Sequence, residues 1–224
     1  MKQTTILFDI NETVLNLTVL RPKFKAIFGD EHYTDTWFSM LLHASTVSMI
    51  TGVNTNFATL SKIMLETLAA KKGIQLTTDV IDDVLGGFSS LPAHDDIKTA
   101  LTALRAAGFR VVAFSNSSLS LIENQINNAG LGPYFDEVIS VEEAGTFKPS
   151  PTAYQFAATK LGQSKDQLRL VATHDWDIHG AMSVGLQGAY IDRSGAPYNP
   201  LYIKPDIYAL TMDAIAAQII ATDQ

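Results

Sequence analysis

The sequence has no cysteine, few basic residues and no long apolar run, and each absence removes a class of function. Without cysteine the chain forms no disulfide, thiolate metal site or cysteine nucleophile, which fits a reducing compartment. With 16 Lys and Arg against 23 Asp and Glu, the net charge is −7, so electrostatics does not favour nucleic-acid binding.

Hydrophobic segments are also too short for membrane or secretory roles. Asp9 interrupts the first apolar stretch before it could serve as a secretory signal. The most apolar longer stretch, residues 40–53, contains His43 and several Ser and Thr residues, so it is too short and too polar to span a bilayer. We therefore expect a soluble, cytoplasmic protein that binds neither nucleic acid nor membrane.

What is present is the composition of an ordinary globular enzyme. The 224 residues include 46% hydrophobic and 17% charged residues, enough for one sizeable domain or a core with a smaller insert. Apolar runs at residues 4–8, 110–114, 137–141, 168–172 and 188–191 lack strict alternation, which is typical of strands buried on both faces.

Helical patterns separate these runs. Residues 96–107 place Ile97, Leu101 and Leu104 on one face, and a second helix begins at Ser150-Pro151 and ends near Gly162. Residues 206–224 are expected to form a short strand followed by a helix. The alternation predicts an α/β fold with a doubly wound, parallel, Rossmann-like sheet and right-handed crossovers.

The segment 15–94 departs from this alternation. It holds helical patterns at residues 35–49 and 57–72 and no convincing strand. We interpret it as a helical cap domain inserted after the first strand, with residues 1–14 and 95–224 forming the core domain. Such a cap would close over the edge of the sheet where Asp9 lies.

Polar residues follow several of the expected strands, at the edge where open parallel sheets place their ligand crevice. Asp9 follows the first strand. A carboxylate can form an ester with carbon or an acyl phosphate with phosphorus, so Asp9 is a candidate nucleophile. Taken alone, an Asp after a strand is weak evidence for catalysis and is better explained as the cap of a turn.

Three later motifs support a catalytic role. The ammonium of Lys148 would keep a nearby Asp9 ionised, although a solvated surface lysine is the alternative. Ser115 and Asn116 suit an anion, either carboxylate or phosphate, and can equally cap a helix. Asp177 can orient or deprotonate water, or cap the helix that follows it.

The series Asp9, Ser115, Lys148-Pro149, Asp177 resembles the motifs of the haloacid dehalogenase superfamily, over essentially the whole chain. Asn11 stands where its phosphatases carry a second Asp, so the chain is more similar to the type II L-2-haloacid dehalogenases. The resemblance implies attack of an Asp on carbon 2 of a 2-haloacid, loss of halide with inversion, and hydrolysis of the resulting ester.

By this resemblance, Asp9 would be the nucleophile, Lys148 its charge partner and Asp177 the acid that orients water. Thr13, Ser115 and Asn116 would hold Asp9 and the substrate carboxylate, and Tyr154 matches the family's Tyr. The remaining predicted substrate-binding residues are Asn11, His174, Trp176, Phe57 and Phe38. The resemblance implies no metal or cofactor. It does imply a homodimer that forms through the cap helices.

Two positions depart from the family. Asn11 replaces a Tyr, and Phe38 replaces an Arg that follows the cap Trp and is thought to help bind the halide. His174 stands where the family often has Asn, and we expect it to be a hydrogen-bonding wall of the pocket, because the sequence gives it no partner. We further expect Phe57, Trp37 and Phe38 to line an apolar pocket that faces Asp9, with ordinary core packing as the alternative.

Two other functions compete with a haloacid dehalogenase. A Mg²⁺-dependent phosphatase needs an acid to protonate its leaving alcohol, which Asn11 cannot supply. It also needs a metal-binding carboxylate where this chain has Thr173, although Asp175 and Asp177 remain. A catalytically silent binding protein would lack an essential residue, whereas all three catalytic candidates are present. The sequence thus favours a metal-independent hydrolase of small 2-haloacids.

Overall fold

A single parallel sheet organises the chain, whose computed structural model describes residues 4–223. Its strand order is β3-β2-β1-β4-β5-β6, and every neighbouring pair is parallel. The strands are β1 (Thr5–Phe8), β2 (Arg110–Ser115), β3 (Glu137–Ser140), β4 (Leu168–Ala172), β5 (Gln187–Ile191) and β6 (Ile207–Ala209). This arrangement confirms the predicted α/β fold.

The strand order places a crevice beside Asp9. From β1 the chain builds outward through β2 and β3, and then returns to the other side of β1 with β4. Phe8 pairs with Ala113 of β2 and Val171 of β4, so all three strands end at the same edge. Ligands of open α/β sheets bind at such a reversal, outside the carboxyl ends of the strands.

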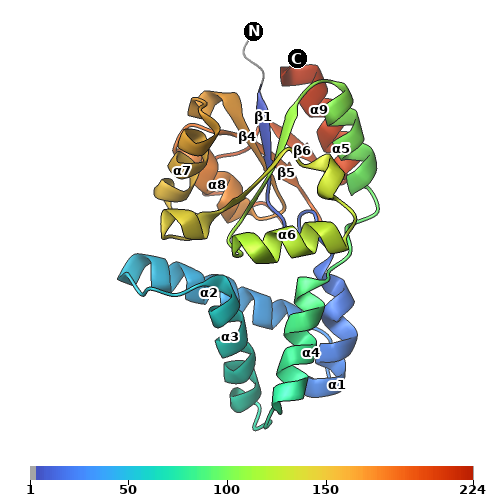
Figure 1. Ribbon diagram of the computed structural model, residues 1–224, viewed down its shortest axis with the longest axis vertical. Helices are drawn as coiled ribbons and strands as arrows, with labels where there is room; N and C mark the ends of the chain where they lie inside the picture. The colour runs from blue at the N-terminus through green and yellow to red at the C-terminus, as the bar shows by residue number, and fades with distance from the viewer. Residues whose placement is uncertain (1–3, 224) are drawn as a thin grey trace.

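Helices cover both faces of the sheet. Figure 1 shows α7 and α8 on one side of it and α5 and α9 on the other. The helices of this part are α5 (Ile97–Ala106), α6 (Leu119–Asn128), α7 (Pro151–Leu161), α8 (Asp175–Ser183) and α9 (Met212–Asp223), with short 3₁₀ turns η2 (Gly132–Tyr134), η3 (Val141–Ala144) and η4 (Lys165–Gln167).

A second group of helices follows β1 and lies beyond the carboxyl edge of the sheet (Figure 1). It comprises η1 (Leu17–Leu20), α1 (Arg21–Phe28), α2 (Tyr33–Thr51), α3 (Phe57–Lys71) and α4 (Thr78–Ser89). Within described residues 15–94 the only β pairing is by isolated bridges. The entering and leaving chains are joined, since Leu15 bridges Ala93 and His94 N donates to Val14 O at 3.0 Å.

Local capping explains where these helices begin and end. The Asn56 side chain accepts from Thr59 N at 2.7 Å at the start of α3, and Ser150 accepts from Thr152 N at the start of α7. Gly162 ends α7 with φ 65°, a left-handed conformation that glycine adopts without steric cost.

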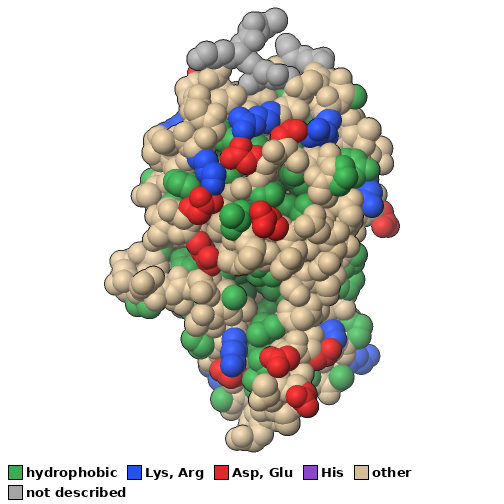
Figure 2. Space-filling model, in the orientation of Figure 1, with side chains coloured by type: hydrophobic (Ala, Val, Ile, Leu, Met, Phe, Trp, Pro, Cys, Tyr) green, Lys and Arg blue, Asp and Glu red, His purple; other side chains and the backbone are tan. Residues whose placement is uncertain are grey.

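Charged side chains of both signs are mixed on the face that Figure 2 shows. There, Lys and Arg side chains lie among Asp and Glu side chains rather than in a basic patch of their own. Of the helices in residues 4–223, none combines the length and apolarity needed to cross a membrane.

Candidate active site

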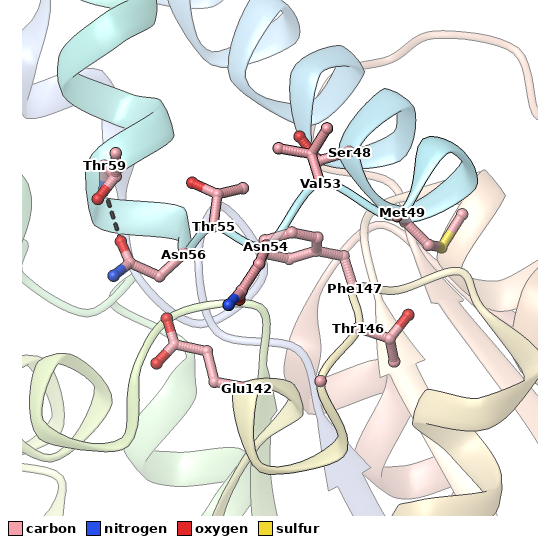
Figure 3. A pocket seen from close by; sticks show the side chains of 12 residues that line it. Ser48, Met49, Val53, Asn54, Thr55, Asn56, Thr59, Glu142, Thr146 and Phe147 are labelled. Atoms are coloured by element: carbon pink, nitrogen blue, oxygen red, sulfur yellow. Dashed lines mark hydrogen bonds between the residues drawn. The ribbon is translucent and has the colours of Figure 1, made fainter.

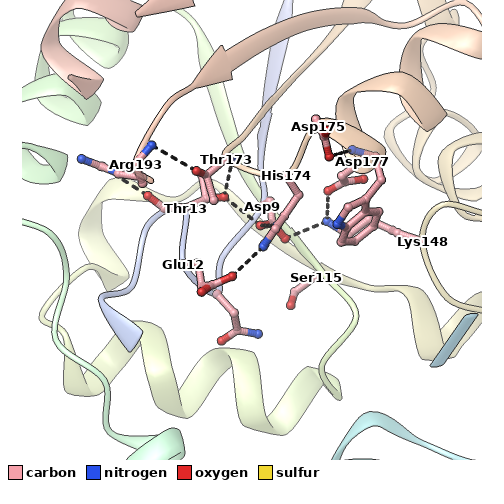
Figure 4. A network of polar contacts seen from close by, with 12 residues as sticks. Asp9, Glu12, Thr13, Ser115, Lys148, Thr173, His174, Asp175, Asp177 and Arg193 are labelled. Atoms are coloured by element: carbon pink, nitrogen blue, oxygen red, sulfur yellow. Dashed lines mark hydrogen bonds and ion pairs between the residues drawn. The ribbon is translucent and has the colours of Figure 1, made fainter. Parts of the chain in front are cut away.

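Asp9 follows β1 and lies at the centre of a buried polar network (Figure 4). Its Oδ1 accepts from Lys148 Nζ at 2.8 Å. Its Oδ2 accepts from Thr13 Oγ1 at 2.8 Å and lies 3.1 Å from His174 Nδ1. Only 5% of Asp9 is exposed. Both of its carboxylate oxygens nevertheless have hydrogen-bond partners, as buried polar groups generally do.

Lys148 joins Asp9 to Asp177. Its Nζ donates to Asp177 Oδ2 at 2.6 Å and to Phe114 O at 3.2 Å, and its side chain is 1% exposed. The backbone N–H of Lys148 donates to Asn116 Oδ1 at 2.8 Å, which fixes the loop that carries the lysine. One buried ammonium thus bridges two buried carboxylates.

In this arrangement the pKa values of Asp9 and Asp177 shift in opposite directions. Burial raises the pKa of Asp9, but the Lys148 ammonium and the His174 hydrogen bond more than offset it, so its pKa lies well below the usual range. Burial also raises the pKa of Asp177, and the charge of Asp9 adds to that effect. Asp9 is therefore ionised at neutral pH, as a nucleophile must be.

Asp177 and Tyr154 lie behind the lysine. Tyr154 donates its hydroxyl to Asp177 Oδ1 at 2.6 Å, and neither side chain reaches the surface. Asp177 does not border the cavity beside Asp9. The water-orienting role predicted for Asp177 thus requires water to reach a side chain that this geometry encloses, and it stays a prediction.

His174 has partners that the sequence did not reveal. Its Nε2 lies 2.8 Å from Glu12 Oε2, and its ring stacks against Trp176 at 5.1 Å and Phe38 at 6.2 Å between centroids. Burial lowers the pKa of His174, but the hydrogen bonds to Asp9 and Glu12 dominate and raise it to about 10. His174 thus lies in the wall of the cavity and makes hydrogen bonds, as predicted, and the sequence had named neither of its partners.

Two predicted substrate-binding residues, Thr13 and Asn11, make hydrogen bonds in and beside the network. Thr13 donates to Asp9 and accepts from Thr173 N at 3.0 Å. Asn11 Nδ2 donates to Ser117 Oγ at 3.2 Å, and its Oδ1 accepts from Gln125 at 3.1 Å. These contacts hold Asn11 on the side of α6.

A small cavity adjoins Asp9. Its volume is about 10 Å³, close to the minimum for one water molecule. The cavity is lined by Asp9, Asn11, Phe38, Leu42, Phe57, Ser115, Asn116, His174 and Trp176. Phe38 and Phe57 therefore lie in an apolar wall as expected, and a substrate can enter only if such side chains move.

Trp37 does not line this cavity, so its prediction is wrong. It is fully buried, packs against Phe24 at 5.4 Å and Phe88 at 5.6 Å, and donates Nε1–H to Ser61 O at 2.9 Å. Trp37 belongs to the core of the helical segment.

Two larger clefts flank the small cavity. One, of about 680 Å³, includes Glu12 and Arg193 and shares Phe38, Leu42, His174 and Trp176 with the cavity. The other, of about 610 Å³, lies where α2 and α3 meet the loop that contains Phe147 (Figure 3). Phe147 contacts Phe57 at 6.4 Å between ring centroids, so aromatic rings separate both clefts from Asp9.

The carboxylates of Asp175 and Asp177 do not converge to hold a metal ion. Among residues 4–223, no group of three His, Asp or Glu side chains is arranged as metal ligands. Asp177 meets Asp9 through the Lys148 ammonium. Asp175 accepts from Trp176 N at 2.7 Å and Asn199 N at 3.2 Å instead, so the donor set does not fit Mg²⁺.

Sequence reasoning missed four residues that hold the site. Arg193 follows β5, pairs with Asp96 through both oxygens and donates to Thr13 O. His94 Nε2 lies 3.0 Å from Glu12 O. The other two are Glu12 and Gln125. Arg193 follows a strand at the same edge as Asp9, which is the one signal that could have identified it.

Comparison with known proteins identifies relatives of this chain. A family model described as haloacid dehalogenase-like hydrolase matches residues 3–171. The (S)-2-haloacid dehalogenase 1 of Pseudomonas sp. (strain CBS-3) is 28% identical over 192 residues, 85% of either chain. Haloacetate dehalogenase H-2 of Moraxella sp. (strain B) is 35% identical over 125 residues. This match spans 56% of this chain and 56% of that protein.

A solved structure shares the fold. L-2-haloacid dehalogenase from Xanthobacter autotrophicus superposes with a TM-score of 0.89 at 20% identity, over 99% of this chain and 100% of that chain. The same enzyme with chloropropionic acid covalently bound gives a TM-score of 0.90. With the family model matching three quarters of its length, the chain belongs to the haloacid dehalogenase-like hydrolases.

Proposed function

We propose that this hydrolase removes halide from small 2-haloacids through an ester on Asp9, without a metal ion or cofactor. The observation that carries the proposal is the buried Asp9 carboxylate, which Lys148 holds ionised at 2.8 Å beside a cavity walled by aromatic rings. The relatives that carry dehalogenase names support the same substrate class.

The first step needs an ionised oxygen and an apolar wall. A lone pair of the Asp9 carboxylate would form a bond to carbon 2, while the carbon–halogen bond breaks and its electron pair leaves with the halide. A halide needs no proton to leave, so Asn11 is compatible with this step. The rings of Phe38, Phe57 and Trp176 would exclude water, which strengthens the electrostatics around Asp9.

The second step needs water at the ester carbon. Water would add to Cγ of Asp9, and the bond from Cγ to the ester oxygen would then break and release a 2-hydroxyacid. We assign Asp177 to orient this water, with Tyr154 and Lys148 holding its carboxylate. Access of water to Asp177 would follow the ring movements that admit the substrate.

The phosphatase alternative has less support. It needs a metal ion beside the nucleophile, and in this site a lysine ammonium bridges Asp9 and Asp177 while Asp175 accepts from Trp176 N. It also needs a leaving-group acid, and Asn11 is neutral and bonded to Ser117 and Gln125.

The test is halide release from each enantiomer of 2-chloropropanoate in the presence of EDTA. We expect release from the (S) enantiomer and a loss on the order of 10⁴-fold or more in Asp9→Asn, which lacks the nucleophile. Asp95→Asn removes an exposed acid elsewhere and should leave the rate unchanged. Phosphate release that requires Mg²⁺, with no halide release, would favour the phosphatase instead.

Three further features belong to the proposal. We infer that residues 15–94 act as a cap that closes over Asp9, that the enzyme is a homodimer, and that it works in the cytoplasm. Light scattering at several protein concentrations tests the dimer, and cell fractionation tests the location. A cap that moves should show faster hydrogen exchange at the 15–16 and 92–94 connections than in the sheet.

A further inference from the structure

Glu12 has a backbone conformation that is unfavourable for its residue type. Its φ is 65°, and it is the one non-glycine residue with positive φ in the described part of the chain. A side chain in this left-handed region is sterically disfavoured, whereas glycine adopts it readily. The sequence nevertheless places a glutamate here, two residues after Ile10 and three after Asp9.

The strained backbone directs the carboxylate of Glu12 at His174 (Figure 4). Glu12 Oε2 lies 2.8 Å from His174 Nε2. The backbone oxygen of Glu12 lies 3.0 Å from His94 Nε2, which holds the turn in place. The strained conformation of Glu12 therefore allows a contact with His174, which also touches Asp9.

The contacts of His174 require a doubly protonated ring. Nδ1 faces Asp9 Oδ2 at 3.1 Å and Nε2 faces Glu12 Oε2 at 2.8 Å. An ionised carboxylate only accepts hydrogen bonds, and a neutral imidazole has a single N–H. Both contacts are satisfied only by an imidazolium, in agreement with the raised pKa of His174.

The two oxygens of Asp9 differ in how many donors they have. Oδ2 accepts from Thr13 Oγ1 and from His174 Nδ1. Among the described residues, Oδ1 accepts from Lys148 Nζ alone. Because each carboxylate oxygen has about two lone-pair sites, Oδ1 keeps one lone pair free for attack and Oδ2 does not.

We propose that Glu12 is a positioning residue which holds His174 as an imidazolium, so that Asp9 Oδ1 attacks and Oδ2 becomes the carbonyl oxygen of the ester. This inference rests on the proposed dehalogenase function. It assigns the hydrolytic step an oxyanion site built from the Thr13 hydroxyl and the His174 Nδ1–H.

In this scheme the two oxygens of Asp9 have different roles in ester formation and ester hydrolysis. The Oδ1 lone pair bonds to carbon 2 and halide leaves with the carbon–halogen electron pair. Water adds to Cγ, and the Cγ–Oδ2 π pair moves onto Oδ2, where Thr13 and His174 donate to it. When this intermediate collapses, the Cγ–Oδ1 bond breaks, the departing alkoxide takes one proton of the water, and the second proton leaves to solvent.

The ester stage makes Glu12 essential for the charge on His174. Before attack, His174 has two anionic partners, Asp9 and Glu12. In the ester, Asp9 carries no charge, and Glu12 is the remaining anion that touches the ring. Loss of the Glu12 charge should therefore slow ester hydrolysis much more than ester formation.

The experiment compares Glu12→Gln and Glu12→Gly with the wild-type enzyme in rapid-quench kinetics with 2-chloropropanoate. In both variants we expect a burst of about one halide per active site, followed by turnover roughly 10–100-fold slower than wild type, less than the cost of deleting an oxyanion donor. Intact-protein mass spectrometry should detect the accumulated ester, and KM should fall along with kcat because the second step limits turnover.

Glu12→Gly separates a positioning role from a structural one. Glycine relieves the backbone strain at φ 65°, so a residue that only shapes the turn would leave this variant as active as wild type and free of adduct. That result, or single-phase turnover in Glu12→Gln at the wild-type rate, would overturn the inference. Asp95→Asn, which removes an exposed carboxylate that does not contact His174, is the matched control and should show no burst.

The proposed function can fail separately. If the wild-type enzyme releases no halide from any 2-haloacid, the dehalogenase proposal is wrong and the inference falls with it. If wild-type turnover occurs and neither variant accumulates ester, only the inference is wrong.

Discussion

At the scale of single residues, the charge of His174 is the feature most open to measurement. Its pKa of about 10 reflects hydrogen bonds to Asp9 and Glu12 that outweigh the effect of burial. We expect ring ¹⁵N shifts in NMR spectra to show an imidazolium up to about pH 9, well above the ordinary histidine value. In Glu12→Gln the titration should move to lower pH.

The same shift predicts how stability depends on pH. The pKa of His174 is higher in the folded protein than the unfolded value of 6.5. Its contribution to the free energy of unfolding is therefore complete below pH 6.5 and is lost as pH rises toward about 10. Urea unfolding across that window should show a smaller loss in Glu12→Gln, and a titration of His174 near its ordinary value would contradict the prediction.

Lys148 supports a second prediction at this scale. In Lys148→Met, the buried acids Asp9 and Asp177 would lose the ammonium that lies 2.8 and 2.6 Å from them. We expect a loss of roughly 3–5 kcal/mol in the free energy of unfolding at neutral pH, as for other broken buried ion pairs. Without the ammonium, the pKa values of both acids should rise.

The pH dependence identifies the cause of that loss. Protonation removes the buried negative charge, so the deficit of Lys148→Met should shrink as pH falls below the raised pKa values. Urea unfolding at neutral and mildly acidic pH provides the comparison. A deficit that does not change with pH would mean that lost packing, rather than charge, destabilises the variant.

The sequence identified the charged centre of the site but not its partners. Asp9 and Lys148 could be paired because they follow strands that end at one edge of the sheet. Glu12 was missed because it follows no strand directly and a positive φ directs its side chain toward His174. Residue order alone gives no indication of such a backbone reversal.

At the scale of elements, the strands and helices of the core followed from apolar runs and capping residues. β4 (Leu168–Ala172) and α7 (Pro151–Leu161) have the predicted bounds. The error at Trp37 has a geometric cause, since neighbouring residues of a helix point in different directions. In α2, Phe38 turns toward His174 while Trp37 turns toward α3.

A contact between α7 and α8 gives a prediction at this scale. A Cβ at Gly180 would lie 2.7 Å from both Pro149 Cβ and Tyr154 Oη, so the helices can approach only with glycine here. We expect Gly180→Ala to lower the free energy of unfolding by roughly 1–3 kcal/mol. It should also slow turnover, because Tyr154 would shift from Asp177.

Gly86 in α4 is the matched control. A Cβ there meets no described atom within 4 Å. Gly86→Ala should therefore stabilise the protein by about 0.5–1 kcal/mol through helix propensity, with no change in turnover. Equal effects of the two substitutions in thermal unfolding would contradict the role assigned to the α7–α8 contact.

At the scale of the whole molecule, two ion networks, each built around a buried cation, occupy opposite ends of the sheet. Lys148, Asp9 and Asp177 lie at the carboxyl edge. Arg169, near the start of β4 and 1% exposed, pairs with Asp206 before β6 and with Asp223 of α9. The first network is positioned for chemistry, and the second ties the C-terminal helix and the outer strand to the centre of the sheet.

The last prediction follows from this separation. Arg169→Ala leaves the buried Asp223 and the half-exposed Asp206 without their guanidinium partner, and loss of the buried pair should lower the free energy of unfolding by roughly 3–5 kcal/mol. Turnover by the remaining folded protein, measured at low temperature, should match wild type, because no atom of Arg169 contacts the Asp9 network in the described structure. The two networks share no partner. The losses in the free energy of unfolding caused by Arg169→Ala and by Lys148→Met should therefore add to within about 0.5 kcal/mol in the double variant. If the double variant refolds too weakly to measure in water, the same comparison in a stabilising osmolyte such as sucrose keeps additivity measurable. A strongly non-additive result would show that the sheet couples its two ends, and the Asp9 site would then depend on the C-terminal helix.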